Sequence, residues 1–301
     1  MRIDVYVPLL LSLLLATVAA PQAGRRIAPA LAARVLATAA VVTAAATTWA
    51  LVLLALTLIN EAPPVVAEAR EDGRHVPEPV PELIGVAALA ALAVITYRVY
   101  RAIRAEAATR RALRRLCQGH PPDAELIVVS SPVPQAFAVP ATRQEPGRIV
   151  VTAAMLAALE PGERRILLAH ERAHLGHRHA LYCTAVALAR AANPLLTPVS
   201  TTVAFLVERW ADESAAGSIG DRTGTARAIA RAALIAHQPR PARALGFTDH
   251  AVTRRVAALQ TAPPPSLWPL ATAVLALGVL PAVGAADATG DLLELLAHLF
   301  V

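Results

Sequence analysis

Apolar residues along the chain are gathered into four long blocks, separated by polar and charged stretches. The blocks cover residues 6–20, 30–59, 83–97 and 267–286. A membrane-spanning helix needs about 20 apolar residues and satisfies its own backbone hydrogen bonds, which lipid cannot do. With their flanking residues, the blocks predict spans at about 5–22, 31–59, 81–100 and 266–286.

The first block has a second interpretation, as a secretory signal that is cleaved, because small residues end it. A secretory signal is normally preceded by net positive charge, whereas Arg2 is offset here by Asp4. The basic pair Arg25 and Arg26 follows the block instead, which favours a retained span with its N-terminus outside. We therefore expect a span and keep the cleaved signal as the alternative.

The stretch between the third and fourth blocks predicts a small domain of mixed α and β structure. β-Branched runs indicate strands, and apolar residues at helical spacing indicate helices. The predicted strands are 126–130, 136–139 and 148–152, the last two paired as a hairpin, and the predicted helices are 161–179, 203–216, 222–236 and 250–259. The expected fold class is mainly α: a polytopic helical membrane protein with an α+β domain inserted between the third and fourth spans. Residues 1–100 would hold three spans, 101–262 the inserted domain, and 263–301 the fourth span and a short tail.

Composition supports a membrane protein, since 56% of the 301 residues are hydrophobic, above the roughly 45–50% of soluble domains. All 28 basic residues are arginine and the net charge is +6. A sequence pI of about 10.3 is also typical of nucleic-acid-binding proteins. The arginines, however, gather beside the apolar blocks, where the positive-inside rule places them. We therefore expect contact with the lipid bilayer and no direct nucleic-acid binding.

The charges flanking the blocks give one orientation. The tail after the fourth block carries Asp287, Asp291 and Glu294 and no arginine, so it is expected outside. A dense basic run after the third block places the inserted domain in the cytoplasm. That run consists of Arg98, Arg101, Arg104, Arg110, Arg111, Arg114 and Arg115. The expected location is a plasma membrane, with both termini outside.

The inserted domain contains the motif His170-Glu171-Arg172-Ala173-His174. Residues four apart on a helix share a face, so His170 and His174 can offer two imidazoles to one metal ion. Zinc commonly accepts such ligands, and in this motif the glutamate acts as base toward the zinc-bound water. Cys117 and Cys183 lie far apart without CxxC spacing, and predict neither a disulfide framework nor a thiolate zinc site.

A third ligand is needed, and the sequence offers a carboxylate. The arrangement HExxHxxGxxH fails, because His177 replaces the glycine and Ala180 the last histidine. A later helix carries Glu208 and Asp212 on one face. Glu208 can bind zinc while Asp212 hydrogen-bonds a ligand imidazole. The alternative is that both acids only solvate a helix face.

Other polar residues near the motif have ordinary interpretations. We expect His177 and His179 to be solvated cations at a helix end, and Trp210 to serve packing or the membrane interface. His250 and Arg255 are candidates for stabilising an oxyanion, although such residues are more often ordinary surface residues.

The run HERAHLGHRH, followed by Asn193-Pro194 and ERWADESAA, resembles the BlaR/MecR family of membrane zinc peptidases. It is also similar to the HtpX and Ste-type proteases, whose second motif is ExxAD. The resemblance covers about residues 80–290. It implies one Zn²⁺ per chain held by His170, His174 and Glu208, a gluzincin-like peptidase domain, and a bacterial plasma membrane location.

The resemblance also implies roles for further residues. Glu171 would be the catalytic base, and Asp212 matches the acid that supports a ligand. The segment Ala136, Phe137, Ala138 and Val139 resembles the edge strand along which substrate binds. An internal hairpin without substrate contact is the alternative.

The implied function is a membrane zinc metalloendopeptidase that cleaves a protein substrate by Glu-assisted attack of a zinc-bound water. BlaR/MecR receptors end in a penicillin-binding sensor domain, whereas about fifteen residues follow the fourth block here, so we expect no such sensor. Regulatory cleavage of a cytoplasmic transcriptional repressor is the favoured role. The alternatives are quality control of membrane proteins and a non-catalytic zinc-binding signalling scaffold.

Overall fold

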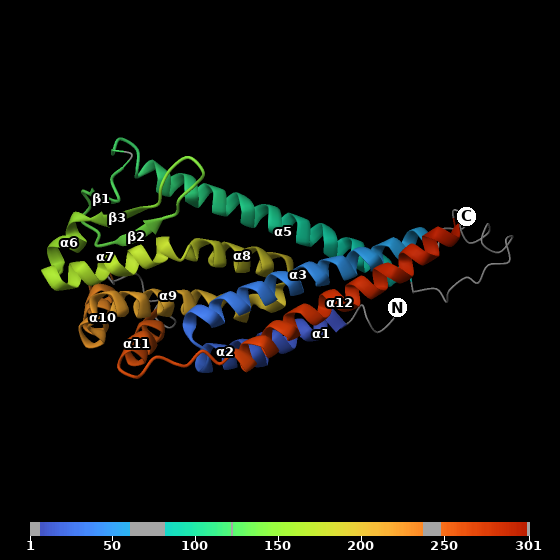
Figure 1. Ribbon diagram of the computed structural model, residues 1–301. Coiled ribbons are helices and arrows are strands. Elements are labelled where there is room, and N and C mark those ends of the chain that lie inside the picture. The colour runs from blue at the N-terminus through green and yellow to red at the C-terminus, as the bar shows by residue number, and fades with distance from the viewer. Residues whose placement is uncertain (1–6, 61–81, 122, 237–247, 300–301) are drawn as a thin grey trace.

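The computed structural model describes residues 7–60, 82–121, 123–236 and 248–299 (Figure 1). Helices make up most of them, which confirms the mainly helical class. The helical elements are α1 (Val7–Leu14), η1 (Leu15–Ala19), α2 (Ala20–Arg26), α3 (Pro29–Asn60), α5 (Glu82–Arg115), α6 (Ala153–Ala158), α7 (Pro161–Gly176), α8 (His179–Ala192), η2 (Pro194–Leu196), α9 (Thr197–Ile219), α10 (Arg222–Ala236), α11 (Thr248–Leu259) and α12 (Trp268–Leu299). The strands are β1 (Leu126–Val129), β2 (Ala136–Val139) and β3 (Arg148–Thr152).

Among the described residues, three helical segments are long and apolar enough to cross a bilayer. They are Val7–Arg26, Pro29–Leu56 and Glu82–Arg115, and they overlap the first three predicted spans. The apolar part of α12, Trp268–Gly284, falls short of that length. A multi-pass membrane protein is thus supported, while the fourth span and the orientation stay predictions.

Helix α3 lies at the centre of the helical bundle and packs against α5, α8, α9 and α12. One apolar core joins α3, α8, α9 and α12: it includes Leu36 of α3, Val186 of α8, Val203 of α9 and Val274 of α12. Figure 1 shows α8 and α9 running alongside α3. The domain between α5 and α12 is therefore anchored in the apolar bundle through its two central helices, α8 and α9.

The turn between α8 and α9 is fixed to the bundle by a buried polar cluster. The side-chain amide of Asn193 donates hydrogen bonds to Oγ of Ser12 at 2.8 Å and Oγ1 of Thr47 at 3.3 Å. Its side-chain oxygen accepts from the backbone N–H of Leu195 at 3.1 Å. Leaving a buried amide without partners costs about 1–3 kcal/mol, so these bonds favour one position of the turn against α1 and α3.

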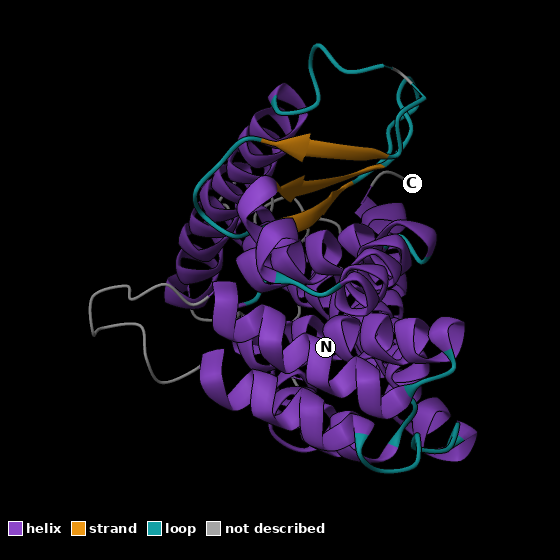
Figure 2. Ribbon diagram, turned by 90° about the vertical axis from the view of Figure 1, so that its left-hand side faces the viewer, coloured by secondary structure: helices purple, strands orange, loops and turns teal. Residues whose placement is uncertain are grey.

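The three strands form one sheet with the order β1-β3-β2, which packs against α7 (Figure 2). The five residues of β3 are all buried, as expected of a central strand. β3 pairs parallel with β1 and antiparallel with β2. The predicted hairpin is therefore confirmed, and β2 is an edge strand.

Local sequence signals explain where α7 begins and ends. The side chain of Glu160 caps the N-terminus, while Oε2 of Glu163 accepts from the backbone N–H of Glu160 at 2.8 Å, so the two form a capping box before Pro161. At the other end, Arg178 has a left-handed φ of 54°, which is uncommon for any residue other than glycine. This residue breaks the helix, and His179 starts α8 in a new direction.

Candidate active site

Two helices bring three metal-ligating side chains together. His170 and His174 lie one turn apart on α7, and their Nε2 atoms are 3.1 Å apart. Glu208 of α9 lies opposite them. Its Oε2 is 3.6 Å from Nε2 of His170, and its Oε1 is 3.5 Å from Nε2 of His174.

These distances fit a zinc ion. Zinc binds nitrogen and oxygen at about 2.0–2.2 Å in tetrahedral sites, which places two ligand atoms about 3.3 Å apart. The three measured separations lie between 3.1 and 3.6 Å. Within the described residues, His170, His174 and Glu208 form a group whose ligand atoms all lie within 4.8 Å of one another. The donor set therefore fits the zinc site that the sequence predicts.

Asp212 supports this group from one turn further along α9. Its Oδ1 lies 3.0 Å from Nδ1 of His170, although the ring N–H does not point squarely at the carboxylate. The same carboxylate accepts two hydrogen bonds from Arg255 of α11, at 2.7 and 2.8 Å. Arg255 also lies 3.0 Å from Oε2 of Glu208. One arginine thus contacts both Glu208 and Asp212.

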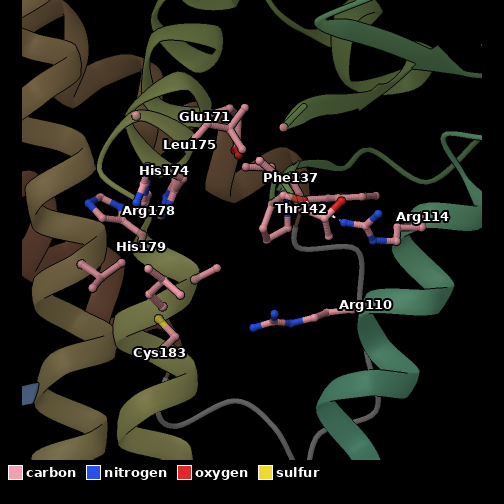
Figure 3. A pocket seen from close by; sticks show the side chains of 18 of the residues that line it. Arg110, Arg114, Phe137, Thr142, Glu171, His174, Leu175, Arg178, His179 and Cys183 are labelled. Carbon is pink, nitrogen blue, oxygen red and sulfur yellow. Dashed lines mark hydrogen bonds between the residues drawn. The ribbon is translucent and has the colours of Figure 1, made fainter. Parts of the chain in front are cut away.

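Glu171 is buried on α7 and lines the cleft beside the three ligands (Figure 3). Burial raises the pKa of its carboxyl to about 7, against the lowering effect of His170. The backbone of Ala138 on β2 also hydrogen-bonds this carboxyl. A carboxyl with a pKa near neutrality can both accept and return a proton.

The two histidines differ in charge before metal binds. Burial opposes the charged form of His170, but contacts with Asp212 and Glu208 outweigh it and raise the pKa to about 10. Burial lowers the pKa of His174 to about 4, although Glu208 acts in the other direction. His174 is thus neutral at pH 7, as a zinc ligand must be.

A cleft of about 1530 Å³ opens onto this site. Its walls come from β2, α7, α8 and the end of α5, and Figure 3 shows Arg110 of α5 extending toward the side of Cys183 of α8, with Arg114 beside Thr142. Phe137 of β2 lies close to Glu171 in the same view. The cleft therefore brings an edge strand, a buried carboxyl and a zinc site to one surface.

A helical domain with two histidines, a distant glutamate and an adjacent cleft is that of a zinc metallopeptidase of the HExxH type. The model of Peptidase family M48 matches residues 100–266, more than half of the chain, and the chain belongs to this family. No curated protein and no solved structure matches the chain. The zinc metallopeptidase activity and the zinc cofactor expected from the sequence are thereby confirmed, at the level of the family of HtpX- and Ste-type peptidases.

Other residues singled out in the sequence have mixed outcomes. The expectation that His179 is a solvated cation is wrong: its side chain is 1% exposed. Its Nδ1 lies 3.0 Å from Nδ1 of His174. His177 is exposed as expected, and Trp210 is a buried packing residue. The side chain of His250 lies outside the described part of the chain.

Helical spacing explains why the contact of His179 was missed. His179 follows His174 by five residues, which on a continuous helix would turn it away from the ligand face. The break at Arg178 redirects the chain, so the ring returns to His174. A left-handed arginine leaves no clear signal in the sequence.

Proposed function

We propose that the chain is a membrane-bound zinc endopeptidase in which His170, His174 and Glu208 bind the ion and Glu171 is the general base. The observation that carries this proposal is that the two imidazole Nε2 atoms lie 3.1 Å apart and 3.5–3.6 Å from the carboxylate oxygens of Glu208, next to the buried Glu171. When bound there, zinc supplies a Lewis acid that activates water and polarises the scissile carbonyl. Glu171 takes the proton from the attacking water and passes it to the leaving amine. Asp212 keeps the His170 ring in the orientation that metal binding needs.

Substrate binds as an added strand along β2 in this proposal. In an antiparallel pair, residues alternate between bonding the partner strand and facing away from it. Gln135 bonds back to Thr152 of β3, so the backbone groups of Ala136 and Ala138 face away from β3. Ala138 hydrogen-bonds Glu171 on this side, and Ala136 is offered to the substrate. Both residues line the cleft, together with Phe137. Backbone pairing at such an edge selects an extended polypeptide, with Phe137 and Val139 completing the strand.

Arg255 was a candidate for stabilising the oxyanion, and its contacts favour another role. Its guanidinium is occupied by Asp212 and Glu208. We therefore assign it to holding these two carboxylates in place. His250 keeps its place as an oxyanion candidate from the sequence alone.

The packing of α8 and α9 along α3 supports substrates that lie close to the bilayer. His179 starts α8 and Glu208 lies in α9, so the helices beside the zinc site continue directly into the apolar bundle. With the inserted domain in the cytoplasm and a fourth span after residue 266, the cleft would open near the inner membrane surface. Regulatory cleavage of the BlaR/MecR kind, acting on a cytoplasmic repressor, is the role we favour.

Comparing the proteins that accumulate with Glu171→Gln and with the wild type tests this function. Glu145→Gln is the control, because it makes the same change at an exposed ion pair with Arg114. Accumulation of one or a few proteins in Glu171→Gln alone supports regulatory cleavage. Accumulation of many membrane proteins would replace that role with quality control. Identical protein profiles in all three strains would contradict proteolysis.

A further inference from the structure

His179 contacts a zinc ligand at the atom that the metal does not use. If Nε2 of His174 binds zinc, its Nδ1 carries the ring proton and must donate it to a partner. Nδ1 of His179 is 3.0 Å away, and the two rings meet edge-on at 90°. His170 has the matching arrangement, since its Nδ1 lies 3.0 Å from Asp212. Each imidazole ligand thus has its own partner, a carboxylate for one and an imidazole for the other.

The surroundings of His179 hold its ring in this position. The side chain is 1% exposed, and the Trp210 ring lies 4.7 Å from it. The ring of His177 stacks on Trp210 at 4.6 Å between ring centres, and the guanidinium of Arg34 lies 4.6 Å from the centre of the Trp210 ring. Arg34 belongs to α3, so this contact series extends from the apolar bundle to the zinc site. A ring held on several sides loses little entropy when it forms one hydrogen bond.

We propose that His179, held in place by Trp210, is the positioning residue of His174 and fixes the tautomer in which this ligand binds zinc. The proposal rests on the zinc site described above. His179 accepts the proton of His174 Nδ1, and its own proton lies on Nε2, which has no hydrogen-bond partner among the described residues. The opposite tautomer would place a proton on Nε2 of His174 and block metal binding.

The test measures zinc affinity of the full-length chain by competition with a chromogenic chelator. His179→Phe keeps a flat ring but removes the acceptor, and should weaken zinc binding about 10–100-fold. His179→Gln restores an acceptor and should recover most of the affinity. His177→Phe is the matched control, because His177 stacks on the same Trp210 but bonds Ser214 instead of a ligand. It should bind zinc like the wild type.

Wild-type affinity in His179→Phe, or an equal loss in His177→Phe or His179→Gln, would overturn the positioning role. If His179→Phe does not fold, ¹⁵N-histidine NMR of the zinc-loaded wild type decides, with signals of residue 179 assigned by their loss in His179→Gln. A bare Nδ1 and a protonated Nε2 support the proposal, and the reverse contradicts it. A wild type that binds no zinc would refute the zinc site itself, which separates the two failures.

Discussion

Replacing Asp212 by asparagine should weaken zinc binding without removing the site. The Asp212 carboxylate is 1% exposed, lies 3.0 Å from Nδ1 of His170, and accepts two hydrogen bonds from Arg255. Asparagine keeps the shape and one acceptor oxygen but removes the charge. His170 is then a weaker ligand, while Arg255 keeps its contact with Glu208.

Loss of a partner that supports a metal ligand typically lowers affinity 10–100-fold. This corresponds to about 1.4–2.8 kcal/mol. The loss of zinc affinity in Asp212→Asn should be about 10-fold, because the amide oxygen can still accept a hydrogen bond from His170. The loss in Asp212→Ala should be about 100-fold. Both variants also break a buried ion pair, which costs about 3–5 kcal/mol of stability when one partner is left behind.

A neighbouring ion pair on the same helix provides the control. Glu213 pairs with Arg222 and is largely buried, but has no contact with the zinc ligands. Glu213→Gln should lower the unfolding temperature while leaving zinc affinity unchanged, as measured by chelator competition. Equal zinc affinities in Asp212→Ala and Glu213→Gln would refute the assignment of Asp212 to His170.

Three further results are expected. Glu171→Gln should keep about one zinc per chain and lower kcat about 10²–10⁴-fold; unchanged kcat in a peptide-cleavage assay would remove Glu171 as the base. Ala136→Pro removes a backbone donor from the open edge of β2 and should raise KM for an unfolded protein substrate, whereas Val128→Pro on the outer strand β1 should not; equal effects would argue against strand addition. Chelation of zinc should lower the unfolding temperature, since a ligand at a thousand times its Kd stabilises by about 4 kcal/mol; a chelator-insensitive transition would indicate that the site adds nothing to stability.

Residues whose role depends on local spacing could be predicted from the sequence. His170 and His174 share a face of α7 by helical periodicity alone. The hairpin of strands 136–139 and 148–152 also follows from the Pro- and Gly-containing turn between them, and the two strands pair antiparallel in the structure. The pairing of Glu208 with this motif required one further assumption, that a distant helix returns to the first.

Packing between segments far apart in the sequence could not be predicted in the same way. The sequence predicts an inserted domain of mixed α and β structure between the third and fourth apolar blocks, and does not predict which of its helices pack against the spans. In the structure, apolar residues of α8 and α9 share the core of α3, with Asn193 bonded to Ser12 and Thr47. Small residues such as the alanines of α3 allow this close packing but carry no amphipathic signal. The partner of a small residue therefore cannot be read from spacing.

The zinc content of purified full-length protein tests the central claim most directly, when the wild type is compared with Glu208→Ala and Glu213→Ala. The wild type and Glu213→Ala should each retain about one zinc ion per chain after dialysis, and Glu208→Ala should lose it, because only Glu208 lies within 3.5–3.6 Å of both imidazole nitrogens among these two acids. One tightly bound zinc ion in Glu208→Ala, or none in the wild type, would contradict the account.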